Sequence, residues 1–288
     1  MKNFNFKNSL KYILLHAIAI VFVLNADAQK ISVELFGGAS NYQGDLQDKR
    51  FTFNQAHLAG GLGVHYSLND HFSLRTGVLL GKVSGDDKLG RNKIRNLNFT
   101  SNITDVHLAL QYYITPLGKN SLTPYVFAGV GLYHFNPYTF DTTNSKYFLR
   151  PLSTEGQGFI EGKNNYQLTQ FNIPFGAGLK LALSENLNVG FEVSMRKLFT
   201  DHLDDVSTEY VDQNLLIANR GMKAAELAFR GGELKNGGLY PQAGTARGGA
   251  ENKDWYYFTG LTLSFRLGNG TIGQSGKHSQ YGCPVNVY

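Results

Sequence analysis

The sequence predicts one fold class, an eight-stranded antiparallel up-and-down transmembrane β-barrel. Side chains alternate between apolar and polar or small with a period of two in eight segments, which is typical of strands. The connections between these segments alternate between short and long, as they do in membrane barrels. The chain also lacks the run of about 18 apolar residues that a membrane-spanning helix needs, so an α-helical membrane protein is excluded.

Residues 1–28 are predicted to be a secretory signal peptide. Three lysines precede an apolar run over residues 12–24, and the small-residue pattern Ala26-Asp27-Ala28 follows it. We expect cleavage after Ala28 and therefore export. The barrel domain is then predicted over residues 29–267, and residues 268–288, rich in glycine and serine, form a C-terminal tail.

Each barrel strand is predicted from its own alternation. In the last segment Leu261, Leu263 and Phe265 lie on one face, and Thr262 and Ser264 lie on the other. The same pattern places the eight strands near residues 30–37, 56–68, 71–83, 102–114, 122–134, 168–183, 187–200 and 255–267. Glycines fall mostly on the less apolar face, which is expected to point into the narrow barrel. Aromatic residues at the strand ends are expected to form girdles at the membrane interfaces.

The lengths of the connections predict which end of the barrel faces which compartment. The short turns lie at residues 69–70, 115–121 and 184–186. The long loops are residues 38–55, 84–101, 135–167 and 201–254. Outer-membrane barrels place short turns in the periplasm and long loops outside, so both ends of the barrel domain and the tail are predicted to be periplasmic.

The predicted inner face carries charged residues, namely Glu34, Arg75, Lys180, Glu192, Arg196 and Arg266. A soluble lipocalin-type barrel, the structural rival, would place its apolar face inward and its polar face outward. Six charges are too many for an apolar ligand cavity. Because unpaired charges in a narrow lumen would be costly, Glu34 and Glu192 are expected to neutralise some of the basic residues. The result would be a polar plug, and a selectivity or gating cluster is the alternative.

No catalytic, cofactor or metal motif is predicted, so the chain is expected not to be an enzyme. The glycine-rich stretches at residues 60–63 and 129–131 lie inside strands with no helix after them, unlike phosphate-binding loops. The histidines lack metal-ligand spacing. Ser194 and His202 could in principle form the nucleophile–base pair of a lipid-modifying enzyme, but no local signature accompanies them. The basic residues are scattered, so nucleic acid is not expected as a partner.

Two loop features and the tail carry further expectations. The acidic runs at Asp86-Asp87 and residues 201–205 lack the ligand spacing of a calcium loop and are expected to be solvated. Helix-forming residues predict a short helix within residues 212–230, interrupted at Gly221. The tail ends in GCPVNVY. It is expected either to be a disordered periplasmic extension or to dock on a periplasmic partner through Cys283, Pro284 and Tyr288.

Four stretches together carry a resemblance to a known family. They are GGASNYQGDL at residues 37–46, HFSLRTGVLLGKVSGDD at 71–87, NLLIANRGMKAAELAFRGGEL at 214–234, and KDWYYFTGLTLSF at 253–265 followed by GCP. The chain resembles the outer-membrane barrel family of Bacteroidota typified by PorG, a component of the type IX secretion system. The resemblance covers nearly the whole chain after residue 28.

The resemblance implies a location in the bacterial outer membrane, among its lipid and lipopolysaccharide. It also implies periplasmic ring proteins similar to PorK and PorN as partners, and a part in protein export and gliding motility. An eight-stranded barrel is too narrow to be the translocation pore, which favours an anchor or assembly subunit. The alternative is a small porin-like or adhesive barrel that acts through its extracellular loops.

Overall fold

The computed structural model describes residues 30–47, 52–117 and 120–267 of the chain. The predicted signal peptide, the tail and the tail residues Cys283, Pro284 and Tyr288 lie outside these ranges. Among the described residues, no helix is long and apolar enough to span a membrane.

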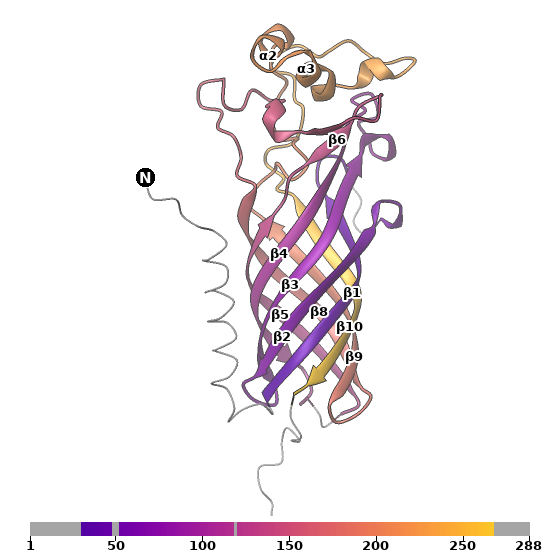
Figure 1. Ribbon diagram of the computed structural model, residues 1–288, viewed down its shortest axis with the longest axis vertical. Coiled ribbons are helices and arrows are strands. Elements are labelled where there is room, and N and C mark those ends of the chain that lie inside the picture. Colours follow the sequence, from indigo (N-terminus) through magenta and orange to yellow (C-terminus); the bar gives the residue numbers. More distant parts are fainter. Residues whose placement is uncertain (1–29, 48–51, 118–119, 268–288) are drawn as a thin grey trace, which may run out of the picture.

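Eight strands close into an antiparallel barrel, as the sequence predicts (Figure 1). Neighbours in sequence pair with one another, the first strand pairs with the last, and pairing of the third with the fourth completes the ring. The barrel strands are β1 (Ile31–Gln43), β2 (His57–Ser67), β3 (Phe72–Asp86), β4 (Asn98–Tyr113), β5 (Leu122–His134), β8 (Thr169–Ala182), β9 (Leu187–Leu198) and β10 (Trp255–Arg266).

Several strands continue beyond their predicted ends at the long-loop side. Strand β1 was predicted to end at residue 37 but runs to Gln43, and β4 begins at Asn98 rather than at residue 102. The positions that would continue the outward alternation, Gly37, Ala39 and Asn41, are small or polar, so the apolar alternation that marks a lipid-facing strand is lost there. Pairing with β10 nevertheless continues up to Gln43 and Trp255. These strand ends extend the barrel above its apolar wall.

The barrel has an apolar outer wall. Exposed side chains at alternate positions include Leu35, Leu62, Leu80, Leu108 and Leu261. The opposite alternation is buried and largely polar: on β4 the burial pattern changes at every residue from Phe99 to Tyr113. An apolar outside and a polar inside are the reverse of a soluble lipocalin-type barrel. The lipocalin alternative is therefore wrong.

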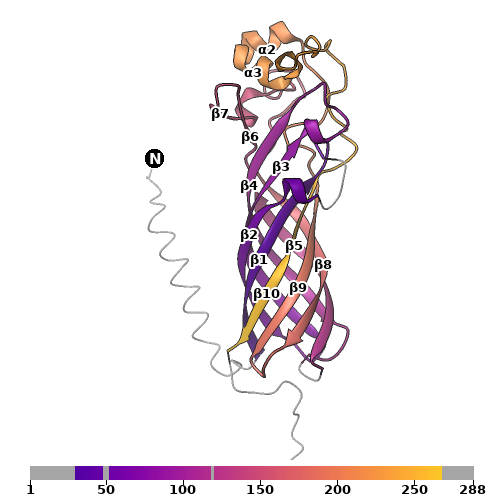
Figure 2. The same ribbon diagram turned by 90° about the vertical axis from the view of Figure 1, so that its right-hand side faces the viewer.

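The connecting loops build a cap at one end of the barrel (Figures 1 and 2). The loop after β5 contains the hairpin β6 (Tyr138–Phe140) and β7 (Lys146–Phe148), which extends the sheet from β4 and was not predicted. The loop before β10 contains α2 (Gln213–Arg220) and α3 (Met222–Ala228). Gly221 separates the two helices with a φ of 86°, so the predicted interruption of the helix is confirmed.

Short 3-10 helices complete the cap-side loops. They are η2 (Phe53–Gln55), η3 (Asp87–Leu89), η4 (Arg150–Leu152) and η5 (Gly231–Glu233). At the opposite end of the barrel the connections are short, and we call this end the turn end. Almost all of the loop structure therefore lies at the cap, and the turn end has only short connections.

Candidate functional site

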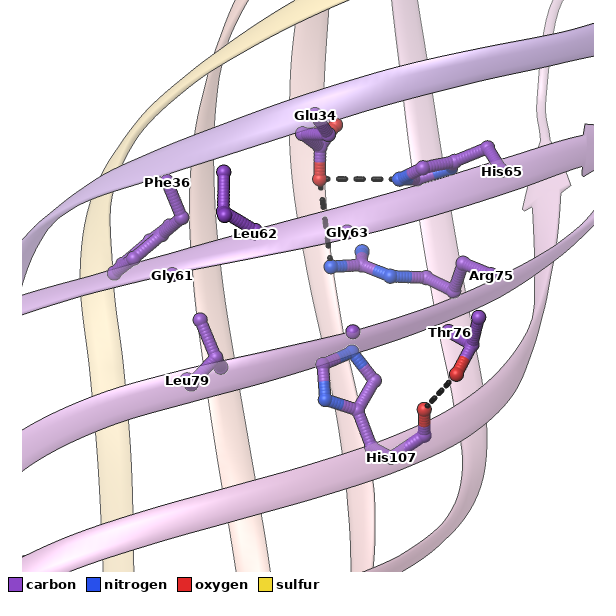
Figure 3. A pocket seen from close by; sticks show the side chains of 11 residues that line it. Glu34, Phe36, Gly61, Leu62, Gly63, His65, Arg75, Thr76, Leu79 and His107 are labelled. Carbon is purple, nitrogen blue, oxygen red and sulfur yellow. Dashed lines mark hydrogen bonds and ion pairs between the residues drawn. The ribbon is translucent and has the colours of Figure 1, made fainter. Parts of the chain in front are cut away.

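The lower half of the lumen is built around Glu34 of β1. Its carboxylate oxygens lie 3.1 Å from His65 Nε2 and 3.6 Å from Arg75 Nη2 (Figure 3). They also lie 2.9 Å from Lys180 Nζ. Ser264 Oγ donates a further hydrogen bond of 2.7 Å. All five side chains are buried, and they come from five different strands. One carboxylate therefore ties most of the barrel circumference together.

Glu192 of β9 forms the second part of this lower network. Arg75 donates two hydrogen bonds to it, of 2.6 and 3.2 Å, and Tyr125 donates one of 2.8 Å. The Arg75 guanidinium also bonds to Gln111 Oε1 and lies 4.3 Å from the centre of the Phe127 ring. A bidentate arginine–carboxylate pair is among the strongest hydrogen-bonded contacts in proteins. It spans the lumen from β3 to β9.

A second network lies nearer the cap, around Asp105 of β4. It accepts hydrogen bonds from Arg196 Nε at 3.1 Å and Nη2 at 3.2 Å, from Asn172 at 2.8 Å and from Tyr256 at 2.7 Å. His107 Nδ1 lies 3.2 Å away. Arg196 is fully buried, and its remaining amino group bonds to Ser194. Every strong charge at this level has a partner.

The structure brings five of the six predicted lumen charges into these two networks. Glu34 and Glu192 pair with Arg75 and Lys180 as expected, but Arg196 pairs with Asp105 instead. Arg266, at the end of β10, is also buried. Asp105 was not among the predicted lumen charges, although the residues around it indicate an inward position. It lies between the outward residues Thr104 and Val106, so the period-two rule already placed it inside.

Aromatic side chains fill the lumen beside and above the ion pairs. Tyr133 stacks against Phe135, and Phe135 stacks against Tyr166, with ring centroids 5.4 and 6.0 Å apart. The prediction of interface girdles is partly wrong here. Tyr112 does lie on the outer wall, but Tyr113, Tyr125, Tyr133 and Tyr256 are buried. These four tyrosines occupy inward positions, one residue out of phase with the lipid-facing side chains. The presence of aromatic residues at a strand end does not show which face they occupy.

The space left in the lower network is very small. A cavity lined by Glu34, His65, Arg75 and His107 has a volume of about 10 Å³, room for about one water molecule (Figure 3). Neighbouring rings fill the space beside the inner glycines. A Cβ on Gly178 would lie 2.4 Å from Tyr125, and a Cβ on Gly176 would lie 2.7 Å from Phe127. Around Glu34, Tyr125 and Phe127 the lumen is therefore packed with side chains.

The cap is locked by Arg247. It donates hydrogen bonds to Glu155 Oε1 at 2.9 Å, to the Ala228 carbonyl oxygen at 3.2 Å and to the Asp205 carbonyl oxygen. Arg95 bonds to both carboxylate oxygens of Asp87, and its guanidinium also reaches the Arg247 carbonyl. Three loops therefore meet at two buried arginines. The Glu155 carboxylate holds the pKa of Arg247 above its ordinary value despite the burial of the guanidinium.

The acidic runs in the loops are not solvated, contrary to the prediction. Asp87, Asp201, Asp204 and Asp205 are all buried. Burial raises the pKa of Asp201 to about 7 and that of Asp205 to about 6. The periodicity of the sequence did not indicate the burial of these aspartates, because their hydrogen-bond partners come from distant loops. Asp205, for example, accepts hydrogen bonds from Thr154 and Tyr166.

A group of neighbouring carboxyls lies below the cap. Tyr42 Oη donates to Asp204 at 2.5 Å and lies 3.4 Å from Asp254. Burial raises the pKa of Asp204 and Asp254 well above the ordinary value. Repulsion from Asp45 adds to the shift of Asp204, and repulsion from Asp204 adds to that of Asp254. Among the described residues, no group of His, Cys, Asp or Glu side chains has an arrangement that could hold a metal ion.

The residues weighed for catalysis have other partners. Ser194 Oγ accepts from Arg196 inside the lumen, whereas His202 stacks on Tyr166 in the cap with ring centroids 4.9 Å apart. Of the remaining histidines, His57 contacts Ser84, His71 contacts the Tyr113 carbonyl, and His134 contacts Thr169.

Comparison with family models assigns the chain. A model described as "Domain of unknown function (DUF6089)" matches residues 11–216, which is more than two thirds of the sequence. The chain belongs to the DUF6089 family. The matched segment of this DUF6089 protein includes seven of the eight barrel strands and both networks of the lumen up to Arg196. A comparison with curated proteins finds no match.

Solved structures that are similar to the DUF6089 chain share little of its sequence. Neisserial surface protein A is 9% identical with a TM-score of 0.40, over 82% of this chain and 97% of that one. The N-terminal β-barrel domain of OprF from Pseudomonas aeruginosa is 15% identical with a TM-score of 0.34, over 81% and 97%. The outer membrane protein OprG from the same organism is 12% identical with a TM-score of 0.36, over 83% and 97%.

The geometry places the DUF6089 chain in the bacterial outer membrane. A closed barrel satisfies every backbone hydrogen bond within the sheet, and its apolar wall faces lipid, which is the β-structure that can span a bilayer. In such barrels the short turns face the periplasm and the long loops face outward. By this rule the cap is predicted to be extracellular.

Proposed function

We propose that this DUF6089 protein is a non-conducting, non-enzymatic outer-membrane barrel that serves as a structural subunit of a protein-secretion machinery. The observation that carries the proposal is the sealed lumen. Arg75 and Glu192 bond across it, the Asp105 network crosses it again nearer the cap, and aromatic rings fill the space between. A barrel that has no room to pass a solute works through its two ends.

The machinery we propose is the type IX secretion system, with the barrel anchoring or assembling its periplasmic ring. This part of the proposal is supported by the resemblance of four stretches of sequence to the barrel family typified by PorG. The turn end would offer the contact surface through its short connections and the tail. Buried ion pairs that cross-link the wall suit such a role, because an anchor needs a rigid barrel rather than a gated one.

Isolation of the complex tests the proposal. The protein, extracted from native membranes under mild detergent, is expected to bring a ring lipoprotein similar to PorK and its partner similar to PorN. Deletion of the chain is expected to stop export of type IX cargo. If no ring protein accompanies the barrel and export continues without it, the proposed role is wrong.

A second function, adhesion through the cap, is favoured by one observation. The cap is an ordered unit in which Arg247 joins the loops after β5 and β9, with Arg95 of the loop after β3 bound to its carbonyl. Pre-ordered loops bind partners at a lower entropic cost than mobile ones do. Loss of cell-surface binding after removal of residues 135–167 or 201–254, with export intact, would support adhesion instead.

A further inference from the structure

Two segments of the cap lie side by side at its outer edge. One is the loop after β3, and the other follows α3 at η5. Arg230 N donates to the Arg95 carbonyl at 3.2 Å, and Asn96 Nδ2 donates to the Arg230 carbonyl at 3.1 Å. The Ile94 carbonyl approaches Gly231 so closely that a Cβ there would lie 2.7 Å from it. We call residues 88–94 and 231–236 together the basic tip.

The basic tip carries an excess of positive charge. Lys88, Lys93 and Lys235 are exposed. Nearby acidic side chains are already engaged: Asp87 is buried against Arg95, and Glu233 accepts two hydrogen bonds from Arg230. The three lysines therefore outnumber Glu233, the one carboxylate within residues 88–94 and 231–236.

Exposed apolar side chains lie among these cations. Leu89 is 60% exposed and Ile94 is 66% exposed, although both belong to the cap and not to the lipid-facing wall. Each is flanked in sequence by a basic residue, Lys88 before Leu89 and Lys93 before Ile94. Apolar side chains rimmed by charges are typical of surfaces that bind another macromolecule.

The tip is held on a rigid base. Arg95, directly after Ile94, donates to both Asp87 oxygens at 2.6 and 2.7 Å and to the Asp45 carbonyl at 3.1 Å. Leu97 N also donates to Asp87 at 2.9 Å. The loop conformation is thus fixed from below by a buried charge pair, which lowers the entropic cost of binding.

We propose that the basic tip is a docking surface for an acidic protein segment that also carries apolar side chains. Charge complementarity selects an acidic partner, because three exposed lysines, Lys88, Lys93 and Lys235, stand around a surface whose one carboxylate, Glu233, is engaged by Arg230. The apolar side chains select polypeptide over an anionic glycan, since sulfate or carboxylate groups would use the cations and leave Leu89 and Ile94 uncovered. This surface lies on the opposite side of the membrane from the proposed ring contacts.

A binding assay with the full chain in phosphatidylcholine nanodiscs tests the proposal. The probe is a fluorescent synthetic peptide of repeating Glu-Glu-Leu, and heparin serves as the glycan probe. The variant Lys88→Glu/Lys93→Glu is expected to bind the peptide at least about tenfold more weakly at low salt, because two attractions become repulsions. Leu89→Ser/Ile94→Ser is expected to weaken binding at both low and high salt, because apolar contacts are not screened.

The control variant is Lys146→Glu/Lys163→Glu, which makes the same charge change elsewhere on the cap. It is expected to bind the peptide as the unaltered chain does. Resistance of the cap to limited proteolysis shows that each variant is folded. Absence of peptide binding to the unaltered chain, or equal weakening by the control, would overturn the proposal. Heparin binding combined with no effect of Leu89→Ser/Ile94→Ser would overturn it in favour of a glycan.

Discussion

Arg75 and Glu192 form a bidentate ion pair across the lumen, with hydrogen bonds of 2.6 and 3.2 Å between strands on opposite sides of the barrel. A pair in this position does two things at once. It neutralises charges that the narrow lumen could not hold alone, and it occupies the path that a solute would need. The stability of the barrel and its closure should therefore change together.

Removal of one partner of this pair should destabilise the barrel. Arg75→Met leaves Glu192 and Glu34 with fewer cations in a buried site, and such a loss costs about 3–5 kcal/mol in the free energy of unfolding. Urea unfolding in detergent micelles measures it. Lys146→Met on the cap surface is the control, with an expected change below about 1 kcal/mol. The double variant Arg75→Met/Glu192→Met should recover part of the stability that Arg75→Met loses. A double variant that loses more free energy of unfolding than the two single variants added together would contradict the assignment of Arg75 and Glu192 as an ion pair.

Gly178 should tolerate no side chain, because it makes room for the ring of Tyr125. A Cβ at residue 178 would lie 2.4 Å from Tyr125 Cζ and 2.7 Å from the Phe191 carbonyl oxygen. Gly178→Ala should push Tyr125 away from Glu192 and destabilise the barrel by about 1–3 kcal/mol, as overpacking does.

The matched control for Gly178 is Gly37→Ala on the outer wall. A Cβ there meets nothing within 4 Å, so the free energy of unfolding should change by less than about 1 kcal/mol. The same urea titration serves both variants. Equal effects of the two substitutions would show that the Tyr125 contact does not constrain residue 178.

The cap should loosen as pH rises from about 4 to about 7. The folded-state pKa of Asp201 is raised to about 7 and that of Asp205 to about 6, while an unfolded aspartate titrates near 4. The folded cap favours the neutral carboxyls, so this contribution to stability is full below the unfolded pKa and is lost as pH rises through the folded pKa. Hydrogen exchange of residues 201–254 should accordingly be faster at pH 8 than at pH 5, after correction for the intrinsic rate.

Asp201→Asn should reduce that pH dependence, since the amide does not titrate. Glu251→Gln, an exposed residue of the same loop, is the control and should leave the profile unchanged. A profile in which Asp201→Asn behaves like the unaltered chain would mean that other groups set the pH response of the cap.

Arg247→Met should open the cap without unfolding the barrel. The substitution leaves Glu155 buried without its guanidinium partner and removes the bonds to the Ala228 and Asp205 carbonyls. Limited proteolysis should cut within residues 201–254 at least about tenfold faster, consistent with the loss of a buried pair. Lys163→Met, which breaks an exposed ion pair with Glu209, should be cut at the original rate.

Local periodicity explains how much of this architecture could be predicted. Outer residues such as Leu261 and Leu263 must face lipid, so the sequence alternates wherever a strand crosses the bilayer, and the eight strands and inner charges followed from that. The alternation fades where β1 rises above the membrane at Ala39 and Asn41, so the strand ends were set too early. Partners from distant strands, such as Asp105 for Arg196, leave only a weak local trace.

The cap shows the limit of sequence reasoning more clearly. A run such as Asp204-Asp205 predicts a solvated loop, because hydrophilic side chains give no local indication that they are buried. Only the fold brings Tyr42 of β1 and Thr154 of a distant loop to these carboxyls. The helix break at Gly221 was predictable because it depends on the residue itself, whereas the charge network depends on segments up to about 200 residues apart in the chain.

Single-channel conductance in planar bilayers tests the central claim, the sealed lumen, most directly. The unaltered chain should give no steady current, and a variant whose cap residues 201–254 are replaced by a short turn should also stay closed, because the Arg75–Glu192 and Asp105–Arg196 pairs remain. Steady single-channel currents from the unaltered chain would contradict the account.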